Sequence, residues 1–286
     1  DKAKPMKTGC LMKKECGVCM HHCRLEEGQT GRCRARKNVE GRIESVNYGR
    51  CTALALDPIE KKPLCRFYPG KRVLSVGSFG CNLSCPFCQN HEISMAGENG
   101  ADYIYLSPKE LASQAEALRE RGNIGAAFTY NEPLVGYEYV RDAAMEVRKR
   151  GMKNILVTNG AFTEETEEAV LPYIDAMNID LKGFTEDYYE KLGGDLETVK
   201  AFIKKAVRAC HVEITTLVVP GENNSVDEMR KLAEWVAALD CEIPLHVTRF
   251  FPRWKMRDRE AADVGNVYQL AEEAGKYLKY VYTGNC

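Results

Sequence analysis

The feature that most restricts the fold of this chain is an alternation of strand-like and helix-like segments over its last three-quarters. The β-rich apolar runs are residues 73–79, 125–129, 154–158, 176–181, 213–219 and 245–250. The amphipathic stretches between them are residues 108–121, 135–150, 164–173, 198–209 and 226–239. Ser107 and Ser225 precede two of these stretches and are expected as helix N-caps. Such alternation predicts a parallel sheet with helices packed outside it.

Polar or otherwise unusual residues follow each predicted strand. A (β/α) barrel gathers its active site at this rim, whereas an open doubly wound sheet gathers polar groups at one switch point. The residues are the cysteines after residue 79, the segment 130–133, Asn159-Gly160, Asp180 with Lys182, Pro220-Gly221, and His246 with Arg249. We therefore predict an α/β fold, a partial (β/α)6 TIM-type barrel over residues 71–286, preceded by a cysteine-rich amino-terminal module over residues 1–70.

Cysteine is unusually frequent, with thirteen cysteines in 286 residues and ten of them in the first 88. The first residues are charged, with no apolar stretch that would serve as a signal peptide, and no apolar run is long enough to span a bilayer. Clustered thiols without an export signal favour metal ligation over disulfides, so we expect a reducing, anaerobic, cytoplasmic setting. The formal net charge of −1, with no long run of one sign, indicates neither a nucleic acid nor a membrane as a partner.

Three of the cysteines lie close together in residues 80–90, GCNLSCPFCQN. Cys81, Cys85 and Cys88 can bind three corners of one iron–sulfur cluster, because thiolates are soft ligands suited to iron. The segment offers no fourth ligand, which is the arrangement needed if a substrate must bind metal directly. A zinc knuckle with a distant fourth ligand, or a set of surface thiols, is the alternative.

The spacing Cys-x3-Cys-x-aromatic-Cys resembles the radical SAM superfamily, over about residues 72–252. Within it the chain most resembles the pyruvate formate-lyase activating enzyme group, and there the AmmeMemoRadiSam-type proteins. The segments that carry this likeness are DPIEKKPL at 57–64, CQN at 88–90, TYNEP at 129–133 and RFFP at 249–252. The resemblance implies an enzyme that reductively cleaves S-adenosylmethionine (SAM) at a [4Fe-4S] cluster. The resulting 5′-deoxyadenosyl radical would remove hydrogen from a protein or a small molecule.

The resemblance also implies which side chains bind SAM. The superfamily's Gly-Gly-Glu-Pro segment is replaced here by the sequence YNEP, in which backbone groups near Asn131 and Glu132 would meet the methionine amino group. Thr158 and Asn159 would line the pocket after the third predicted strand. Glu132 stands before a proline, so starting a helix is its plain structural alternative.

Four further residues take SAM-binding roles from the same resemblance. Phe87 would lie near the adenine, Asp180 and Lys182 near the methionine and ribose, and His246 near the nucleoside. A surface ion pair is the alternative for Asp180 and Lys182, and a core or rim position is the alternative for His246. The group often has an Asp immediately before its Thr-Asn-Gly run, where it helps hold a monovalent cation. This chain has Val157 there, so we expect no such cation site.

A second group of cysteines lies in the amino-terminal module, and the similar AmmeMemoRadiSam-type proteins have a matching cysteine-rich start. Four thiolates suit a structural zinc ion or another iron–sulfur cluster, with zinc as our first choice. His21 and His22 lie between them and could replace one thiolate. The four residues are Cys16, Cys19, Cys23 and Cys33. Cys10 has no evident partner.

The acceptor of the radical stays open at this point. One alternative is a dedicated activase of a glycyl radical enzyme, and another is direct modification of a small molecule or a different protein. A third is a metal-binding interaction module without turnover, against which the three-cysteine segment weighs because a structural site needs no incompletely ligated cluster. The enzyme readings require a one-electron donor of the flavodoxin or ferredoxin type.

Overall fold

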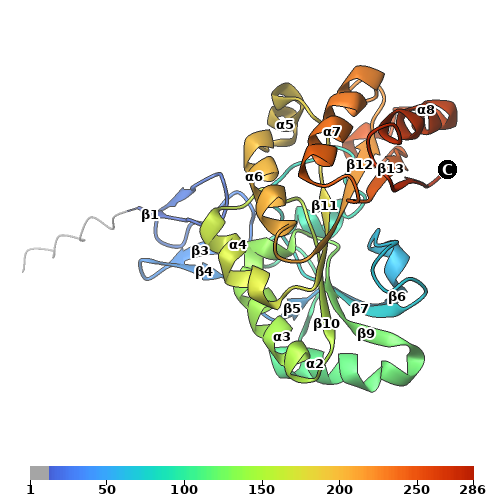
Figure 1. Cartoon of the computed structure of the whole chain (residues 1–286). Helices are drawn as coiled ribbons and strands as arrows, with labels where there is room; N and C mark the ends of the chain where they lie inside the picture. The colour runs from blue at the N-terminus through green and yellow to red at the C-terminus, as the bar shows by residue number, and fades with distance from the viewer. Residues whose placement is uncertain (1–12) are drawn as a thin grey trace, which may run out of the picture.

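A computed structural model describes residues 13–286, so Cys10 and the other residues before 13 lie outside the described part of the chain. Its centre is an eight-stranded sheet in the order β14-β13-β12-β11-β10-β9-β7-β6 (Figure 1). The strands are β6 (Ala53–Pro58), β7 (Arg72–Gly77), β9 (Asn123–Phe128), β10 (Lys153–Thr158), β11 (Ala176–Asp180), β12 (His211–Val218), β13 (Leu245–Arg249) and β14 (Val281–Gly284).

The sheet confirms the partial barrel expected from the sequence. Six strands of this sheet pair in parallel with one another, and each corresponds to a predicted β-rich run. They are β7, β9, β10, β11, β12 and β13. Two edge strands were not expected, since β14 adds in parallel to β13 and β6 adds antiparallel to β7. β6 lies before residue 71, in the part of the chain assigned to the amino-terminal module, and the division at residue 70 stays a prediction. All six of its residues pair with β7, so the sheet begins by residue 53.

Helices follow the strands and cover the outer side of the sheet (Figure 1). Ser107 and Ser225 are confirmed as N-caps, because their side chains accept hydrogen bonds from the backbone N–H groups of Glu110 and Glu228. Of the eight helices in the described residues, α1, α5 and α8 were not expected. The helices are α1 (His91–Ser94), α2 (Pro108–Ala117), α3 (Tyr137–Lys149), α4 (Glu164–Val170), α5 (Glu186–Leu192), α6 (Leu196–Ala206), α7 (Val226–Leu239) and α8 (Val264–Ala274). None of them is long and apolar enough to cross a membrane.

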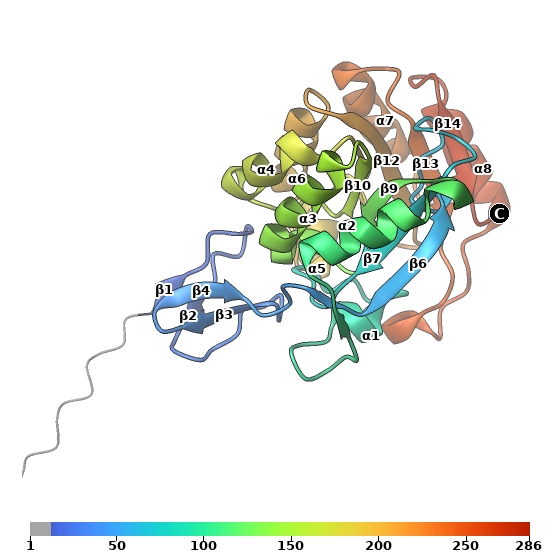
Figure 2. The same cartoon turned by 90° about the horizontal axis from the view of Figure 1, so that it is seen from below.

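The amino-terminal module lies at one side of the barrel (Figure 2). It is built from small antiparallel pairs, β1 (Lys14–Glu15) with β2 (Arg24–Leu25), and β3 (Arg36–Val39) with β4 (Arg42–Ser45). A further pair, β5 (Arg50–Cys51) with β8 (Ile104–Tyr105), joins the segment after β4 to the segment before α2. Arg36 anchors the module to α3 through two 2.7 Å hydrogen bonds to the Glu138 carboxylate. Such a bidentate pair also fixes orientation.

Candidate active site

The cysteine loop follows β7, the first parallel strand of the sheet. It carries Cys81, Cys85 and Cys88, of which Cys85 is buried and the other two are partly buried. The backbone N–H of Leu83 donates a hydrogen bond to the Cys81 sulfur at 3.4 Å. All cysteines of residues 13–286 are free thiols, which leaves them available for ligation.

The loop after β9 is tied to the cysteine loop by Asn131. The Asn131 side-chain N–H donates to the carbonyl oxygens of Phe79 and Gly80, both at 3.1 Å. Its Oδ1 accepts a 2.9 Å hydrogen bond from the backbone N–H of Ser78. Asn131 therefore contacts the backbone that leads into the cysteine loop, and its amide acts there as a structural brace.

Glu132 joins the loops after β9 and β10. Its buried carboxylate accepts hydrogen bonds from the Thr158 hydroxyl at 2.8 Å and from the backbone N–H of Asn159 at 2.7 Å. A third comes from the backbone N–H of Leu134 at 3.0 Å. Burial raises the pKa of Glu132 to about 7, although these donors act in the opposite direction. The protonation state of this buried carboxyl group therefore depends on the hydrogen-bond donors and charges beside it.

Asn159 completes the link from this carboxylate to the thiols. Its side-chain N–H donates to Asn82 Oδ1 at 2.8 Å and lies 3.8 Å from the Cys81 sulfur. Asn82 is fully buried and donates to the Ala161 carbonyl at 2.9 Å. In the sequence, Asn82 is marked only by its place between two cysteines. Its burial could not be predicted, because an amide side chain gives no sign of burial in the sequence.

Asp180 and Lys182 form an ion pair at the end of β11, with 2.9 Å between Lys182 Nζ and Asp180 Oδ2. Burial would lower the pKa of Lys182, but Asp180 and the Cys85 thiol raise it, and the net shift is upward. Lys182 is therefore a cation close to the cysteine loop. The hydroxyl of Tyr189, a residue the sequence did not indicate, accepts a 3.1 Å hydrogen bond from the backbone N–H of Lys182.

The remaining two predicted side chains have different surroundings. Phe87 is buried and packs edge-on against Phe250, with 6.5 Å between ring centroids. His246 Nε2 lies 2.7 Å from Glu213 Oε2, and its ring stacks on Tyr282. These contacts place His246 in a polar group within the sheet and not in the network around Glu132. Its contact with the nucleoside stays a prediction.

The environment of the thiols fits a bound cationic cluster. Burial raises the pKa of Cys85 to about 11 and that of Cys81 well above its ordinary value. Thiolates at such positions need a cation beside them, which an iron–sulfur cluster provides. Within residues 13–286 no three His, Cys, Asp or Glu side chains are grouped to hold one metal ion. A [4Fe-4S] cluster binds each thiolate to a different iron, so its ligands are spread around the cluster.

The amino-terminal cysteines also lie near one another. Cys16, Cys23 and Cys33 each act electrostatically on Cys19, whose pKa is raised to about 12, mainly by burial. Their metal, whether zinc or a second cluster, stays a prediction. His21 has a role that the sequence did not indicate, because its Nε2 lies 2.8 Å from the carbonyl oxygen of Asn82.

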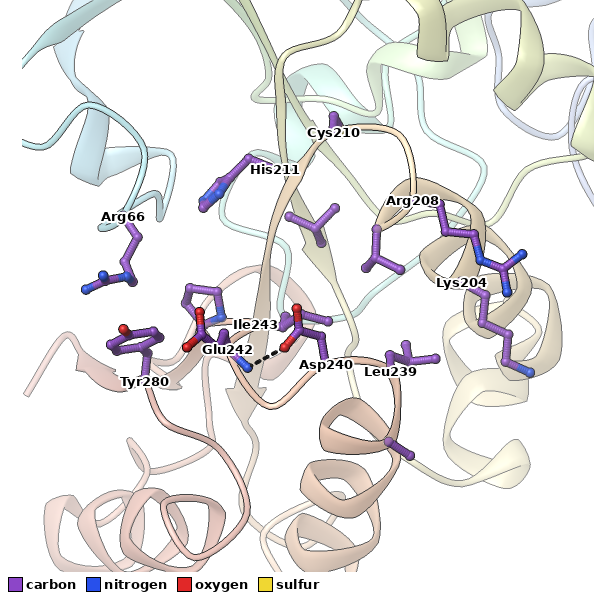
Figure 3. Close-up of a pocket in the computed structure, with 14 residues that line it drawn as sticks. Arg66, Lys204, Arg208, Cys210, His211, Leu239, Asp240, Glu242, Ile243 and Tyr280 are labelled. Carbon is purple, nitrogen blue, oxygen red and sulfur yellow. Dashed lines mark hydrogen bonds between the residues drawn. The ribbon is translucent and has the colours of Figure 1, made fainter.

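One cavity lies away from these residues. It has a volume of about 640 Å³ and borders the starts of β12 and β13, whereas the cysteine loop follows the end of β7 (Figure 3). Arg66, Arg208 and Tyr280 are among its lining residues. None of the predicted SAM-binding residues lines it, so this cavity is separate from the candidate active site.

A partial parallel barrel with a three-cysteine loop after its first strand defines a class of iron–sulfur proteins. Residues 75–236, more than half of the chain, match the Radical SAM superfamily. The chain belongs to this superfamily, whose members bind SAM and a [4Fe-4S] cluster.

Relatives and solved structures agree with this assignment. An uncharacterised protein of Methanocaldococcus jannaschii is 39 % identical over 96 % of this chain and 81 % of its own length. The pyruvate formate-lyase 1-activating enzyme of Escherichia coli is 25 % identical over 58 % of this chain and 69 % of its own length. The crystal structure of Streptococcus suis SuiB, at 14 % identity, covers 75 % of this chain with a TM-score of 0.58, and the match spans 51 % of the SuiB chain. These likenesses support the predicted fold and the resemblance to the activating-enzyme type.

Proposed function

We propose that this protein is a radical SAM enzyme in which Cys81, Cys85 and Cys88 bind the [4Fe-4S] cluster. When reduced and bound to SAM, the cluster would supply the electron for the cleavage of SAM to methionine and a 5′-deoxyadenosyl radical. The observation that carries the proposal is the chain of contacts from Glu132 through Asn159 to the Cys81 sulfur. It joins the thiols to the rim residues that the superfamily uses for SAM.

The protein's own groups have distinct tasks in this proposal. Lys182 offers a cation for the methionine carboxylate, and a charge-assisted hydrogen bond of this kind is a strong one. Asn131 and Glu132 position the segment that meets the methionine amino group. Phe87, which packs against Phe250, offers an apolar wall near the adenine. A closed pocket of buried side chains would keep water away from the radical.

Release of 5′-deoxyadenosine tests the proposal. Anaerobically reconstituted protein is mixed with SAM and dithionite without substrate, and 5′-deoxyadenosine and methionine are measured by chromatography. We expect slow release of both from the wild type and none from the variant in which Cys81, Cys85 and Cys88 are all replaced by Ala. Cys241→Ser, at an exposed thiol, is the matched control and should behave as the wild type. A fully loaded wild type that releases no 5′-deoxyadenosine would contradict the proposal.

The acceptor of the radical is a protein or a small molecule, and a flavodoxin or ferredoxin type donor supplies the electron. A protein acceptor is supported by a solved structure of SuiB bound to its precursor peptide, a fold relative at 15 % identity with a TM-score of 0.57.

Activation of a glycyl radical enzyme is the second candidate. It is favoured by the 25 % identity to the activating enzyme of Escherichia coli and to a putative activating enzyme of Methanocaldococcus jannaschii. Genomic neighbours test it first, because a dedicated activase is expected beside its target. The appearance of a glycyl radical signal on that neighbour, only when SAM and this protein are present, would establish it.

A further inference from the structure

The amino-terminal module and the cysteine loop meet through backbone contacts of their cysteines. The backbone N–H of Cys81 donates a 3.2 Å hydrogen bond to the carbonyl oxygen of Cys33. The last cysteine of the amino-terminal group and the first cysteine of the loop are therefore joined by a backbone hydrogen bond. Gly80 permits this approach, since a Cβ at that position would lie 2.6 Å from the Cys33 carbonyl oxygen.

A second contact lies one residue further along the loop. His21 Nε2 is 2.8 Å from the carbonyl oxygen of Asn82, and since a carbonyl only accepts, His21 donates this hydrogen bond. Asn82 in turn accepts from Asn159, which also faces the Cys81 sulfur. The module thus holds the backbone at Cys81 and at Asn82.

The other end of the amino-terminal group is bonded to the loop after β10. Cys19 forms a β-bridge with Phe162, and the Val18 carbonyl accepts a 2.9 Å hydrogen bond from the Thr166 hydroxyl. This loop follows Thr158 and Asn159 directly. The module therefore contacts both the cysteine loop, which carries the Cys81 thiol, and the loop after β10, which lies beside this thiol.

The part of the module that carries Cys16, Cys19 and Cys23 has little regular secondary structure. Its strands β1 and β2 have two residues each, and strands of that length are too short for independent stability. Cys16, Cys19 and Cys33 are buried, and Cys23 is partly buried. In small modules of this kind, metal binding supplies the folding free energy.

We infer that Cys16, Cys19, Cys23 and Cys33 hold a thiolate-bound metal centre that keeps the cysteine loop in its cluster-binding geometry. The centre acts as a structural brace that takes no part in the chemistry. The inference rests on the proposed function for the identity of the second set of ligands. Within residues 13–286 no three of these side chains are grouped to hold one metal ion. This favours an iron–sulfur cluster over zinc, because a cluster binds each thiolate to a different iron, and the experiment separates the two metals.

The presence of the centre is tested in the variant with Cys81, Cys85 and Cys88 replaced by Ala. Elemental analysis after anaerobic reconstitution should find roughly one zinc per chain, or about four irons with sulfide. Either result supports the centre and names its metal. A folded variant without metal would overturn the inference, and it would do so whatever the wild type does with SAM.

The coupling is tested by two substitutions of His21 that leave all cysteines in place. His21→Ala removes the hydrogen bond to Asn82, whereas the amide N–H₂ of His21→Gln can restore it. In fully reconstituted protein, iron loss from the radical SAM cluster to a chelator should be about two- to tenfold faster in His21→Ala, the range for one hydrogen bond. His21→Gln should be close to the wild type, and so should the control His22→Ala, whose side chain faces Glu15.

The double variant Cys16→Ser/Cys19→Ser tests the metal itself. We expect the radical SAM cluster in this variant to lose most of its change in electron paramagnetic resonance on SAM addition. The coupling would be overturned if the double variant kept the wild-type response to SAM and if His21→Ala and His21→Gln lost iron at the same rate. Release of 5′-deoxyadenosine by the wild type is measured in the same series. A failure of the proposed function can then be told apart from a failure of the coupling.

Discussion

The backbone N–H of Asn159 donates a 2.7 Å hydrogen bond to the carboxylate of Glu132, which joins the loops after β10 and β9. Thr158 donates to the same carboxylate from the last position of β10. Two adjacent strand ends are thereby fixed next to the Cys81 thiol. Preorganisation of this kind is what a site needs to hold a cofactor and its substrate without rearrangement.

Replacing Glu132 with Gln should weaken this junction. Glutamine keeps one acceptor oxygen but turns an N–H₂ group toward N–H or O–H donors, so at least one buried donor loses its partner. Such a loss costs about 1–3 kcal/mol. We expect the free energy of unfolding, from urea titration of cluster-free protein, to fall by that amount. Glu168→Gln, at an exposed ion pair with Lys205, should change it little. Equal values for the two variants would contradict the assigned role.

Replacing Lys182 with Ala should weaken SAM binding while the cluster stays intact. One charge-assisted hydrogen bond is worth about 1.5–3 kcal/mol, or roughly ten- to a hundredfold in affinity. The measurement is a SAM titration of the reduced cluster by electron paramagnetic resonance. Lys191→Ala is the control, because Lys191 also pairs with a carboxylate but is exposed. Unchanged SAM affinity in Lys182→Ala would exclude Lys182 from the site.

The sequence predicted the six parallel strands because hydrophobic periodicity reports burial directly. It also singled out Glu132 and Asn159, since unusual polar residues directly after strands stand out, whereas Thr158 was named only through the family resemblance. It could not indicate His21 as a contact of Asn82, because that pair is 61 positions apart and depends on how the module docks. β6 was missed for a related reason, since a six-residue edge strand is recognised by its partner more than by its composition.

Glu213 should make stability depend on pH in the acid range. Burial would raise its pKa, but hydrogen bonds from His211, His246 and two backbone N–H groups lower it to about 2. A carboxyl with a depressed folded-state pKa stabilises the protein above its unfolded value of 4.5, and this contribution is lost as the pH falls toward 2. The full contribution is about 3 kcal/mol, from a shift of roughly two and a half pKa units.

The variant Glu213→Gln tests this by urea unfolding of cluster-free protein at several pH values. The gap in unfolding free energy between wild type and variant should narrow by about 1 kcal/mol from pH 6 to pH 3.5. Glu228→Gln is a control of opposite sign, because burial raises the pKa of Glu228. There the wild type should gain stability relative to the variant as the pH falls. Parallel pH profiles for the wild type and Glu213→Gln would refute the assignment.

Gly80 and Gly28 form a matched pair for the contact between the module and the cysteine loop. Both have positive φ, +91° for Gly80 and +74° for Gly28, so replacement by Ala strains the backbone at each. A Cβ at Gly28 meets nothing within 4 Å, whereas a Cβ at Gly80 lies 2.6 Å from the Cys33 carbonyl oxygen. Only Gly80→Ala should therefore push the module away from the cysteine loop.

The two variants should differ in the radical SAM cluster more than in overall stability. Backbone strain alone costs about 1–2 kcal/mol, and we expect at least this loss of unfolding free energy in both. Iron retention and the response of the reduced cluster to SAM should fall in Gly80→Ala and stay at wild-type level in Gly28→Ala. If both variants retained the cluster equally, the close approach at Cys33 would have no bearing on cluster binding. If both lost it equally, backbone strain and not the close approach at Cys33 would be the cause, because Gly28 lies outside the contact.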